Sequence, residues 1–197
     1  MKALSINWVV LGSLWLSAIV LGLPMLMKYE NTPGAAANPP VQWGSNSQIR
    51  LSPDRPTLVM LAHPHCPCTR ASIAELAKLM TKHQSKLNAY VLFLSPNASG
   101  TDWQKTDLWR SAELIPGVTV LSDTNGIEAK QLNSTTSGQT LVYSPQGQLL
   151  FSGGITAARG QTGDNFGLNS LISTLDTQST KPRKAPVFGC PMVNPSP

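Results

Sequence analysis

The stretch TLVMLAHPHCPC, at positions 57–68, joins an apolar run to a cluster of histidine and cysteine. Its first half, residues 57–62, follows Pro56 and is continuously apolar, which is typical of a buried strand in a parallel or mixed sheet. Its second half, residues 63–68, holds two of the three cysteines and two of the three histidines of the chain. Reactive groups in such sheets tend to follow the carboxyl ends of strands, so the stretch predicts a reactive site there.

A helix is predicted directly after the cysteines. Apolar side chains in residues 69–84 recur with the spacing i, i+3, i+4 and i+7, at Ile73, Leu76, Ala77 and Met80. We place Cys66 at the N-cap and Pro67 at the first helical position, where a missing N–H costs nothing. The Cys66 sulfur then faces unsatisfied backbone N–H groups and the positive end of the helix dipole, which stabilise a thiolate.

Cys66 is therefore the predicted nucleophile, because a thiol reacts as its thiolate and a helix N-terminus lowers the thiol pKa. His65 and His63 add positive charge or accept the thiol proton, which makes His65 a further catalytic candidate. The competing interpretation is that these cysteines are small buried apolar residues. Two histidines and two prolines around the thiols are not needed for that, and they favour chemistry.

Two thiols compete to resolve whatever Cys66 forms. Cys68 lies two residues away, and on a regular helix two such side chains project roughly 200° apart, so a disulfide between them would need a distorted first turn. Cys190, near the C-terminus, is the other candidate, unless it is a tail thiol with no role. Three cysteines is an odd number, which argues against a purely structural disulfide framework.

Composition predicts one domain with extensions and excludes some functions. The chain has 197 residues, 41% of them hydrophobic, and a formal net charge of +5 drawn from only 13% charged residues. Basic residues are scattered apart from Lys181, Arg183 and Lys184, without the basic stripe and interleaved aromatics of a nucleic-acid binder. We expect no nucleic-acid partner.

The first 28 residues read as a membrane anchor or signal. Residues 3–27 carry no charge and lie between Lys2 and Lys28, and about 20 apolar residues are enough to span a bilayer. Residues 35–37 offer an A-x-A-like cleavage possibility, but the apolar run is longer than a signal-peptide core, so we favour an uncleaved anchor. We expect a single-pass protein of a bacterial inner membrane, with its domain facing the periplasm.

The rest of the chain is predicted to hold a flexible linker at 29–50, a domain at 51–177 and an extended tail with Cys190 at 178–197. The linker is rich in Pro, Gly, Ala, Asn and Ser, and its Trp43 has no assigned place. The predicted strands are 57–62, 88–95, 118–121, 140–143 and 148–151. The predicted helices are 69–84, 103–115 with Thr101 or Asp102 as N-cap, 127–132 and 166–175 with Asp164 or Asn165 as N-cap. This order gives an α/β sandwich with a mixed sheet.

These residues resemble the thioredoxin-like superfamily, particularly membrane-anchored bacterial proteins of the TlpA type. The motifs at residues 63–68, 153–156 (GGIT) and 187–191 (VFGCP) are similar to a subfamily labelled RedB-like. The resemblance implies a thioredoxin-like α/β/α sandwich and a thiol-disulfide oxidoreductase that acts on protein thiols or disulfides or with a membrane electron donor. Two departures stand out: Thr69 fills the place of the second cysteine of Cys-x-x-Cys, and Gly138 fills that of a cis-proline.

A soft-metal site is the alternative function. The ligands would be Cys66, Cys68 and one of His63 or His65, with Cys190 as an addition, a set suited to copper as Cu(I) or to zinc. Copper chaperones of the Sco kind, which are also thioredoxin-like, use the fold in this way. Because two ligands so close in sequence rarely close a tetrahedral site unaided, we expect no resident metal or cofactor.

Two further residues have an expected place. Arg159, in a glycine-rich loop, is expected to be a solvated surface charge, with contact to the thiolate or a substrate anion as the alternative. His83, on the helix after the cysteines, is expected to be exposed.

Overall fold

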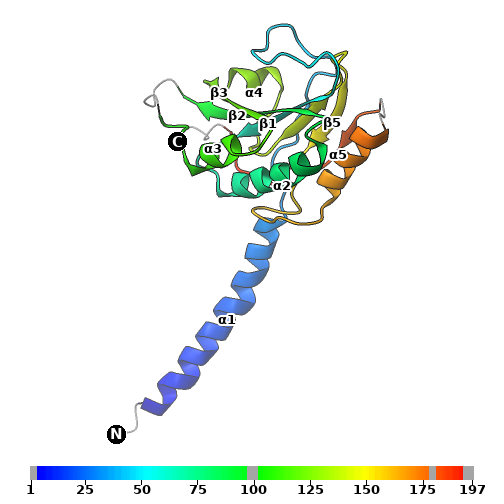
Figure 1. Ribbon diagram of the computed structural model, residues 1–197. Coiled ribbons are helices and arrows are strands. Elements are labelled where there is room, and N and C mark those ends of the chain that lie inside the picture. The colour runs from blue at the N-terminus through cyan, green and yellow to red at the C-terminus, as the bar shows by residue number, and fades with distance from the viewer. Residues whose placement is uncertain (1–3, 97–101, 178–180, 193–197) are drawn as a thin grey trace.

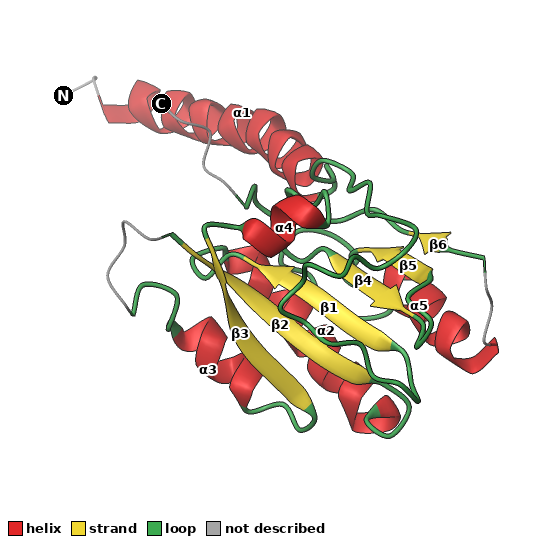
Figure 2. Ribbon diagram, turned by 90° about the horizontal axis from the view of Figure 1, so that it is seen from above, coloured by secondary structure: helices red, strands yellow, loops and turns green. Residues whose placement is uncertain are grey.

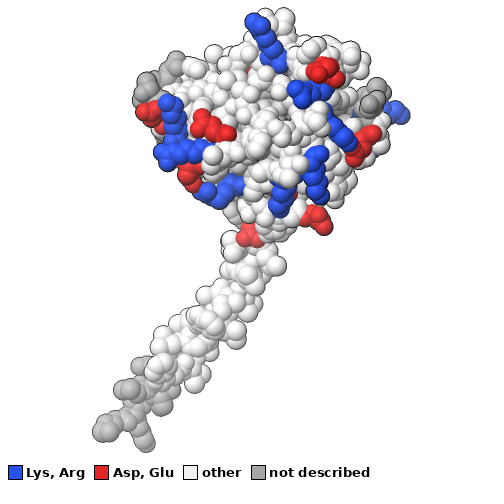
Figure 3. All heavy atoms as spheres, viewed as in Figure 1, with Lys and Arg blue, Asp and Glu red and all other residues white. Residues whose placement is uncertain are grey.

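A long helix carries the domain on its end (Figure 1), in a computed structural model that describes residues 4–96, 102–177 and 181–192. This helix, α1, spans Leu4–Glu30. Its segment Trp8–Glu30 is long and apolar enough to cross a membrane, judged by length and composition, and none of it is buried. On the face seen in Figure 3, its described part shows no acidic or basic side chain up to the junction with the domain.

One mixed sheet organises the domain. Its strands are β1 Thr57–Ala62, β2 Asn88–Ser95, β3 Val118–Thr124, β4 Thr140–Tyr143, β5 Leu149–Gly153 and β6 Arg183–Lys184. They lie in the order β3-β2-β1-β4-β5-β6. Strands β1, β2 and β3 run parallel, β4 runs antiparallel to β1 and β5, and β6 runs parallel to β5. The predicted mixed sheet is confirmed.

Helices cover the two faces of the sheet unequally. They are α2 Pro67–His83, α3 Asp107–Glu113, α4 Ile127–Gln131 and α5 Phe166–Thr177. Figure 2 shows α2, α3 and α5 on one face and the short α4 on the other. The apolar core divides in the same way, with Leu76, Trp109 and Leu171 on the first side and Ala129 on the second. Together these layers form the predicted thioredoxin-like sandwich.

Strand β1 positions the site. All six of its side chains are buried, because β2 and β4 flank it and both faces are covered. Its even-numbered residues such as Met60 enter one core and its odd-numbered residues such as Leu61 enter the other, as the two-residue period of a strand requires. The chain therefore leaves the middle of the sheet at Ala62, directly before the cysteines.

The segment predicted as a flexible linker is in fact packed on the domain, so this prediction is wrong. A five-residue helix cannot cover the second face alone, and residues from the segment 41–51 complete it. The Trp43 ring lies against Tyr143, with the ring centroids 4.7 Å apart, and Ile49 is only 3% exposed. The folded unit therefore begins before residue 51.

The start of helix α3 and its cap differ from the prediction. The helix predicted at 103–115 begins at Asp107, with Thr106 at the N-cap. The preceding residues are held in a turn because buried Gln104 hydrogen-bonds Ser95 and Ser122 on neighbouring strands. Thr101, one suggested cap, lies outside the described residues.

His83 is buried rather than exposed. It lies at the end of α2 with 7% of its surface accessible, and its Nδ1 is 3.3 Å from the Leu79 carbonyl oxygen. Its Nε2 is 4.0 Å from the Asp176 carboxylate at the end of α5. His83 therefore belongs to the contact between the two helices.

Candidate functional site

Cys66 occupies the N-cap of α2, as the sequence predicts. Its backbone is extended, with φ −89° and ψ 116°, and Pro67 begins the helix. The Cys66 N–H donates to the His63 carbonyl at 3.1 Å, and the Cys66 carbonyl accepts from the Thr69 N–H at 3.0 Å. The first helical turn thus holds the cysteine at the edge of the sheet beyond β1.

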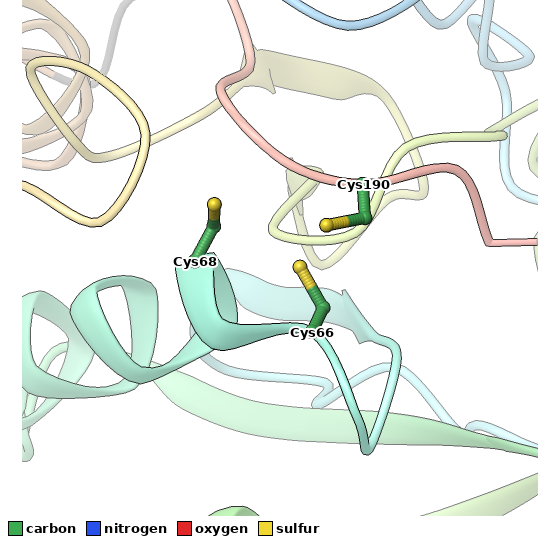
Figure 4. Close-up of side chains that lie close together, drawn as sticks. All are labelled: Cys66, Cys68 and Cys190. Atoms are coloured by element: carbon green, nitrogen blue, oxygen red, sulfur yellow. The ribbon is translucent and has the colours of Figure 1, made fainter. Parts of the chain in front are cut away.

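The three cysteines converge on one place. The Sγ atoms of Cys66, Cys68 and Cys190 all lie within 4.8 Å of one another, and all three are free thiols. Figure 4 shows them around the space between the start of α2 and the C-terminal segment. The expectation that Cys66 and Cys68 point apart is wrong, because Cys66 is extended and not helical, so the helical 100° step does not apply to it.

The C-terminal segment brings Cys190 to the site by pairing with residues 135–137. The Ser137 N–H donates to the Cys190 carbonyl at 2.8 Å, and the Met192 N–H donates to the Thr135 carbonyl at 2.7 Å. A Cβ added to Gly189 would lie only 1.9 Å from the Ser137 carbonyl oxygen, so this approach requires glycine. Cys190 is half-buried at this position.

Hydrogen bonds give the three thiols unequal acidity. Burial opposes ionisation of Cys66, but hydrogen bonding from Cys190 and then from Thr69 outweighs it and lowers its pKa, although the Cys66 sulfur makes no capping bond to the helix N–H groups. Burial and the neighbouring Cys66 charge raise the pKa of Cys68. Burial, with the hydrogen bond to Cys66 next, raises the pKa of Cys190 to about 12. Of the three thiols, Cys66 alone has a lowered pKa, which favours its ionised form relative to the other two.

A short chain of hydroxyl groups ties the loop before Cys66 to the first turn of α2. The Ser137 Oγ accepts from the His63 backbone N–H at 2.8 Å and lies 2.7 Å from the Thr69 Oγ1. The Thr69 hydroxyl donates to the His63 carbonyl oxygen at 3.4 Å, which leaves its oxygen to accept from Ser137. The residue that replaces the second cysteine of the usual motif therefore acts as a hydrogen-bond donor.

The two histidines lie beside the thiols but do not join them. Their rings contact Trp103, with centroids 5.6 Å from it for His63 and 4.6 Å for His65. Burial, followed by the proximity of His65, lowers the pKa of His63. In the described part of the chain, the group of converging donor atoms contains the three cysteines and neither histidine. The structure therefore does not assemble the predicted set of Cys66, Cys68 and a histidine, and the catalytic role of His65 stays a prediction.

Arg159 is not a free surface charge, contrary to expectation. Its guanidinium donates to the Gly189 carbonyl, next to Cys190, and to the Thr32 carbonyl at 3.2 Å. It also lies over the Tyr29 ring at 4.9 Å, and its N–H donates to the Glu30 carbonyl at 3.0 Å. One side chain thus joins the end of α1 to the segment that carries Cys190.

Gly138 lies at the position where the family usually has a cis-proline. Its φ is +86°, which glycine tolerates, and its N–H donates to the Leu61 carbonyl at 2.7 Å. A proline has no N–H and could not make this hydrogen bond. The described residues contain no cis peptide bond.

Sequence reasoning missed Ser137, and the helix cap after the glycine-rich loop was left open. Ser137 lies 68 residues from Thr69 and carries no local signal of their contact. Of the two caps suggested for α5, Asn165 makes the bond, since its Oδ1 accepts from the Leu168 N–H at 2.8 Å.

No protein-family model and no curated protein matches the sequence. An uncharacterized conserved protein from Geobacillus kaustophilus is similar in structure, with a TM-score of 0.59 at 15% identity over 85% of this chain and 95% of that chain. A hypothetical protein from Sinorhizobium meliloti 1021 gives 0.59 at 16% identity over 82% and 93%. A secreted Mycobacterium tuberculosis disulfide oxidoreductase homologous to E. coli DsbE gives 0.45 at 12% identity over 63% and 82%.

The first two likenesses concern the fold, and they extend over most of this chain. The sheet order, the helix that begins at Cys66 and the antiparallel β4 and β5 after it match what the sequence resemblance implies. The chain accordingly has a thioredoxin-like fold.

Proposed function

We propose that the protein is a membrane-anchored thiol-disulfide oxidoreductase in which Cys66 attacks and Cys190 resolves. The observation that carries this proposal is the position of the Cys66 sulfur, at the start of α2 and within 4.8 Å of the Cys190 sulfur. A thiolate is the reacting form of cysteine, and the donors around Cys66 stabilise it. The resemblance to TlpA-type and RedB-like proteins supports the same activity.

The exchange proceeds in two balanced steps. The Cys66 thiolate attacks one sulfur of a partner disulfide, forms a mixed disulfide and releases the other partner sulfur as a thiolate. Cys190, on losing its proton to that leaving thiolate, attacks the Cys66 sulfur, which closes the Cys66–Cys190 disulfide and releases the second partner sulfur as a thiolate that takes a proton from solvent. Two electrons and one proton pass from the protein to the partner, and a dithiol donor reverses the steps to restore the pair.

Cys190 is favoured over Cys68 as the resolving thiol because of where its hydrogen bonds go. Among the groups that lower the pKa of Cys66, hydrogen bonding from Cys190 has the largest effect. Cys190 also lies on a separate segment from Cys66, the C-terminal segment that is hydrogen-bonded to residues 135–137. Cys66 itself is 2% exposed, so a partner reaches it only when this segment moves aside.

The partner is proposed to be a protein disulfide or dithiol at the membrane surface. The contacts of Arg159 hold the last residues of α1 against the loop beside Cys190, which places the site close to where the chain leaves the apolar helix. A dithiol protein embedded in the same membrane is the proposed electron donor. Disulfides form and persist in oxidising compartments such as the bacterial periplasm. We therefore place the domain in the periplasm, attached to the inner membrane by its N-terminal helix.

The test is disulfide exchange by the full-length protein in detergent. Reduced wild-type protein is mixed with an insulin or glutathione disulfide, and the thiols released are followed over time. We expect Cys66→Ser to abolish exchange, Cys190→Ser to accumulate a mixed disulfide on Cys66, and Cys68→Ser to keep most of the rate. Exchange that survives in Cys66→Ser would refute the assignment of the nucleophile.

A further inference from the structure

Cys68 takes no part in the exchange proposed above, yet its sulfur faces the same place as the two that do. It is 8% exposed, in the first turn of α2, and its Sγ lies within 4.8 Å of both other Sγ atoms. A disulfide needs two thiols. The disulfide therefore does not explain why a third sulfur lies beside the other two.

We propose that Cys66, Cys68 and Cys190, when reduced, form a three-sulfur binding site for Cu(I). In a planar complex, the metal ion lies about 2.3 Å from each of three sulfurs. The three sulfurs are then about 4 Å from one another. The separations in the structure reach no more than 4.8 Å. Each sulfur therefore needs to shift by less than about 1 Å to reach bonding distance of a shared ion. Side-chain rotation can supply such a shift while α2 and the C-terminal segment stay in place.

The ligand set selects the metal. Soft thiolate ligands favour Cu(I), which accepts three donors in a plane, whereas Zn²⁺ in structural sites almost always takes four. In the described part of the chain, no histidine nitrogen or carboxylate oxygen belongs to the converging group. The arrangement thus supplies three soft donors, without the fourth protein ligand of a closed zinc site.

The surroundings suit a bound monovalent ion. Three thiolates and one Cu(I) carry a net charge of −2, and Arg159, whose charge acts on both Cys68 and Cys190, offsets part of it. Cys66 and Cys68 are almost fully buried, which shields the ion from water and oxidants. Pro67 and the hydrogen bonds between residues 190–192 and 135–137 fix the backbone that presents the three sulfurs.

Binding is a ligand exchange with no change of oxidation state. The thiols give their protons to solvent as the Cu–S bonds form. The Cys66–Cys190 disulfide of the exchange reaction removes two of the three ligands, so the oxidised protein should not bind. Binding requires only that the three cysteines are reduced. The copper proposal can therefore be tested separately from disulfide exchange activity.

The experiment titrates reduced full-length protein in detergent with Cu(I) under anaerobic conditions, against bicinchoninate as the competing chelator. We expect one Cu(I) per chain and no binding by the oxidised protein. Cys68→Ser should weaken binding by about a hundredfold or more, since changes in outer-shell residues alone typically cost 10–100-fold. His65→Ala and His63→Ala are the matched neighbouring controls and should leave the affinity unchanged.

X-ray absorption of the wild-type copper complex gives a readout that does not depend on any variant folding. Three sulfurs at about 2.3 Å, with no nitrogen in the shell, are expected. The proposal is overturned if Cys68→Ser binds as tightly as wild type, if His63→Ala removes binding, or if the sulfur shell counts two. Displacement of Cu(I) by an equal concentration of Zn²⁺ would overturn the choice of metal.

Discussion

Thr69 stabilises the Cys66 thiolate through its hydroxyl group, and its substitution tests that contribution. Thr69→Val keeps the shape of the side chain but removes the donor, so the pKa of Cys66 should rise. A hydrogen bond to a charged group is worth about 1.5 kcal/mol or more, so below the wild-type pKa the thiolate fraction should fall by about tenfold. The rate of iodoacetamide reaction at Cys66 measures it.

Thr69→Ser is the matched control, because it keeps the hydroxyl and loses only a methyl group. Its reaction rate should stay close to that of wild type. Equal rates in Thr69→Val and Thr69→Ser would mean that the hydroxyl does not reach the sulfur.

The pH dependence of alkylation should separate the three thiols. Because the pKa of Cys66 is lowered, its reaction rate should rise with pH and level off below the pH at which an ordinary thiol does. Burial and the nearby Cys66 charge raise the pKa values of Cys68 and Cys190, so both should stay protonated and slow there. Peptide mapping after brief alkylation should find one labelled cysteine, and early labelling of Cys68 would contradict this order.

At this scale, the sequence predicts the position of Cys66 at the helix start but not the residues around it. Cys66 could be placed because Pro67 and the apolar periodicity mark a helix start, which is local information. Ser137 contacts Thr69, which is 68 residues away in the sequence, and Arg159 contacts Gly189, which is 30 residues away. No local sequence pattern encodes contacts of this kind. The angle between Cys66 and Cys68 was mispredicted because a cap residue does not follow helical geometry.

The C-terminal segment acts as a cover over Cys66, and Gly189 is where its fit is tightest. Gly189→Ala places a methyl group against the Ser137 carbonyl, which should push the segment away from residues 135–137. We expect the alkylation rate of Cys66 to rise several-fold and the free energy of unfolding to fall. Thiol labelling and urea denaturation measure the two effects.

Gly44→Ala is the control for this change, since an added Cβ there meets nothing within 4 Å. It should leave both quantities unchanged. A Gly189→Ala protein with the labelling rate of wild type would show that the segment does not limit access.

At the scale of elements, the strands were predictable and α3 was less so. The strands at 57–62 and 88–95 are continuous apolar runs, and the hairpin has its glycine at Gly147, where φ is +82°. The start of α3 depends on the side chain of Gln104, which bonds to two strands and holds the preceding residues in a turn. Such a tertiary contact overrides local helix propensity.

The whole molecule is held together partly by the segment between α1 and β1. A fragment of residues 51–197 lacks Trp43 and Ile49, and it also lacks the Pro40 carbonyl that accepts from the Tyr143 hydroxyl at 2.9 Å. Burial of one large apolar side chain contributes about 1.5–3 kcal/mol. The fragment should therefore be less stable to urea than residues 31–197, by at least about 3 kcal/mol. Equal stability of the two fragments would restore the linker interpretation.

Composition predicts an apolar helix and one domain, but it does not predict where the packed part of the chain begins. The segment 29–50 looks like a linker because Pro, Gly and Ser dominate it. The few apolar side chains of the segment decide its structure more than its average composition does. They pack on the part of the second sheet face that the short α4 leaves uncovered. A per-segment composition cannot reveal which face of a sheet lacks a cover.

The central claim is that Cys66 and Cys190 form the working pair. The most direct measurement is peptide mapping by mass spectrometry of the full-length protein, oxidised by a stoichiometric disulfide and alkylated without reduction. We expect the peptide containing Cys66 to be linked to the peptide containing Cys190, with Cys68 recovered as an alkylated free thiol. A bond between Cys66 and Cys68, with Cys190 alkylated, would contradict the account.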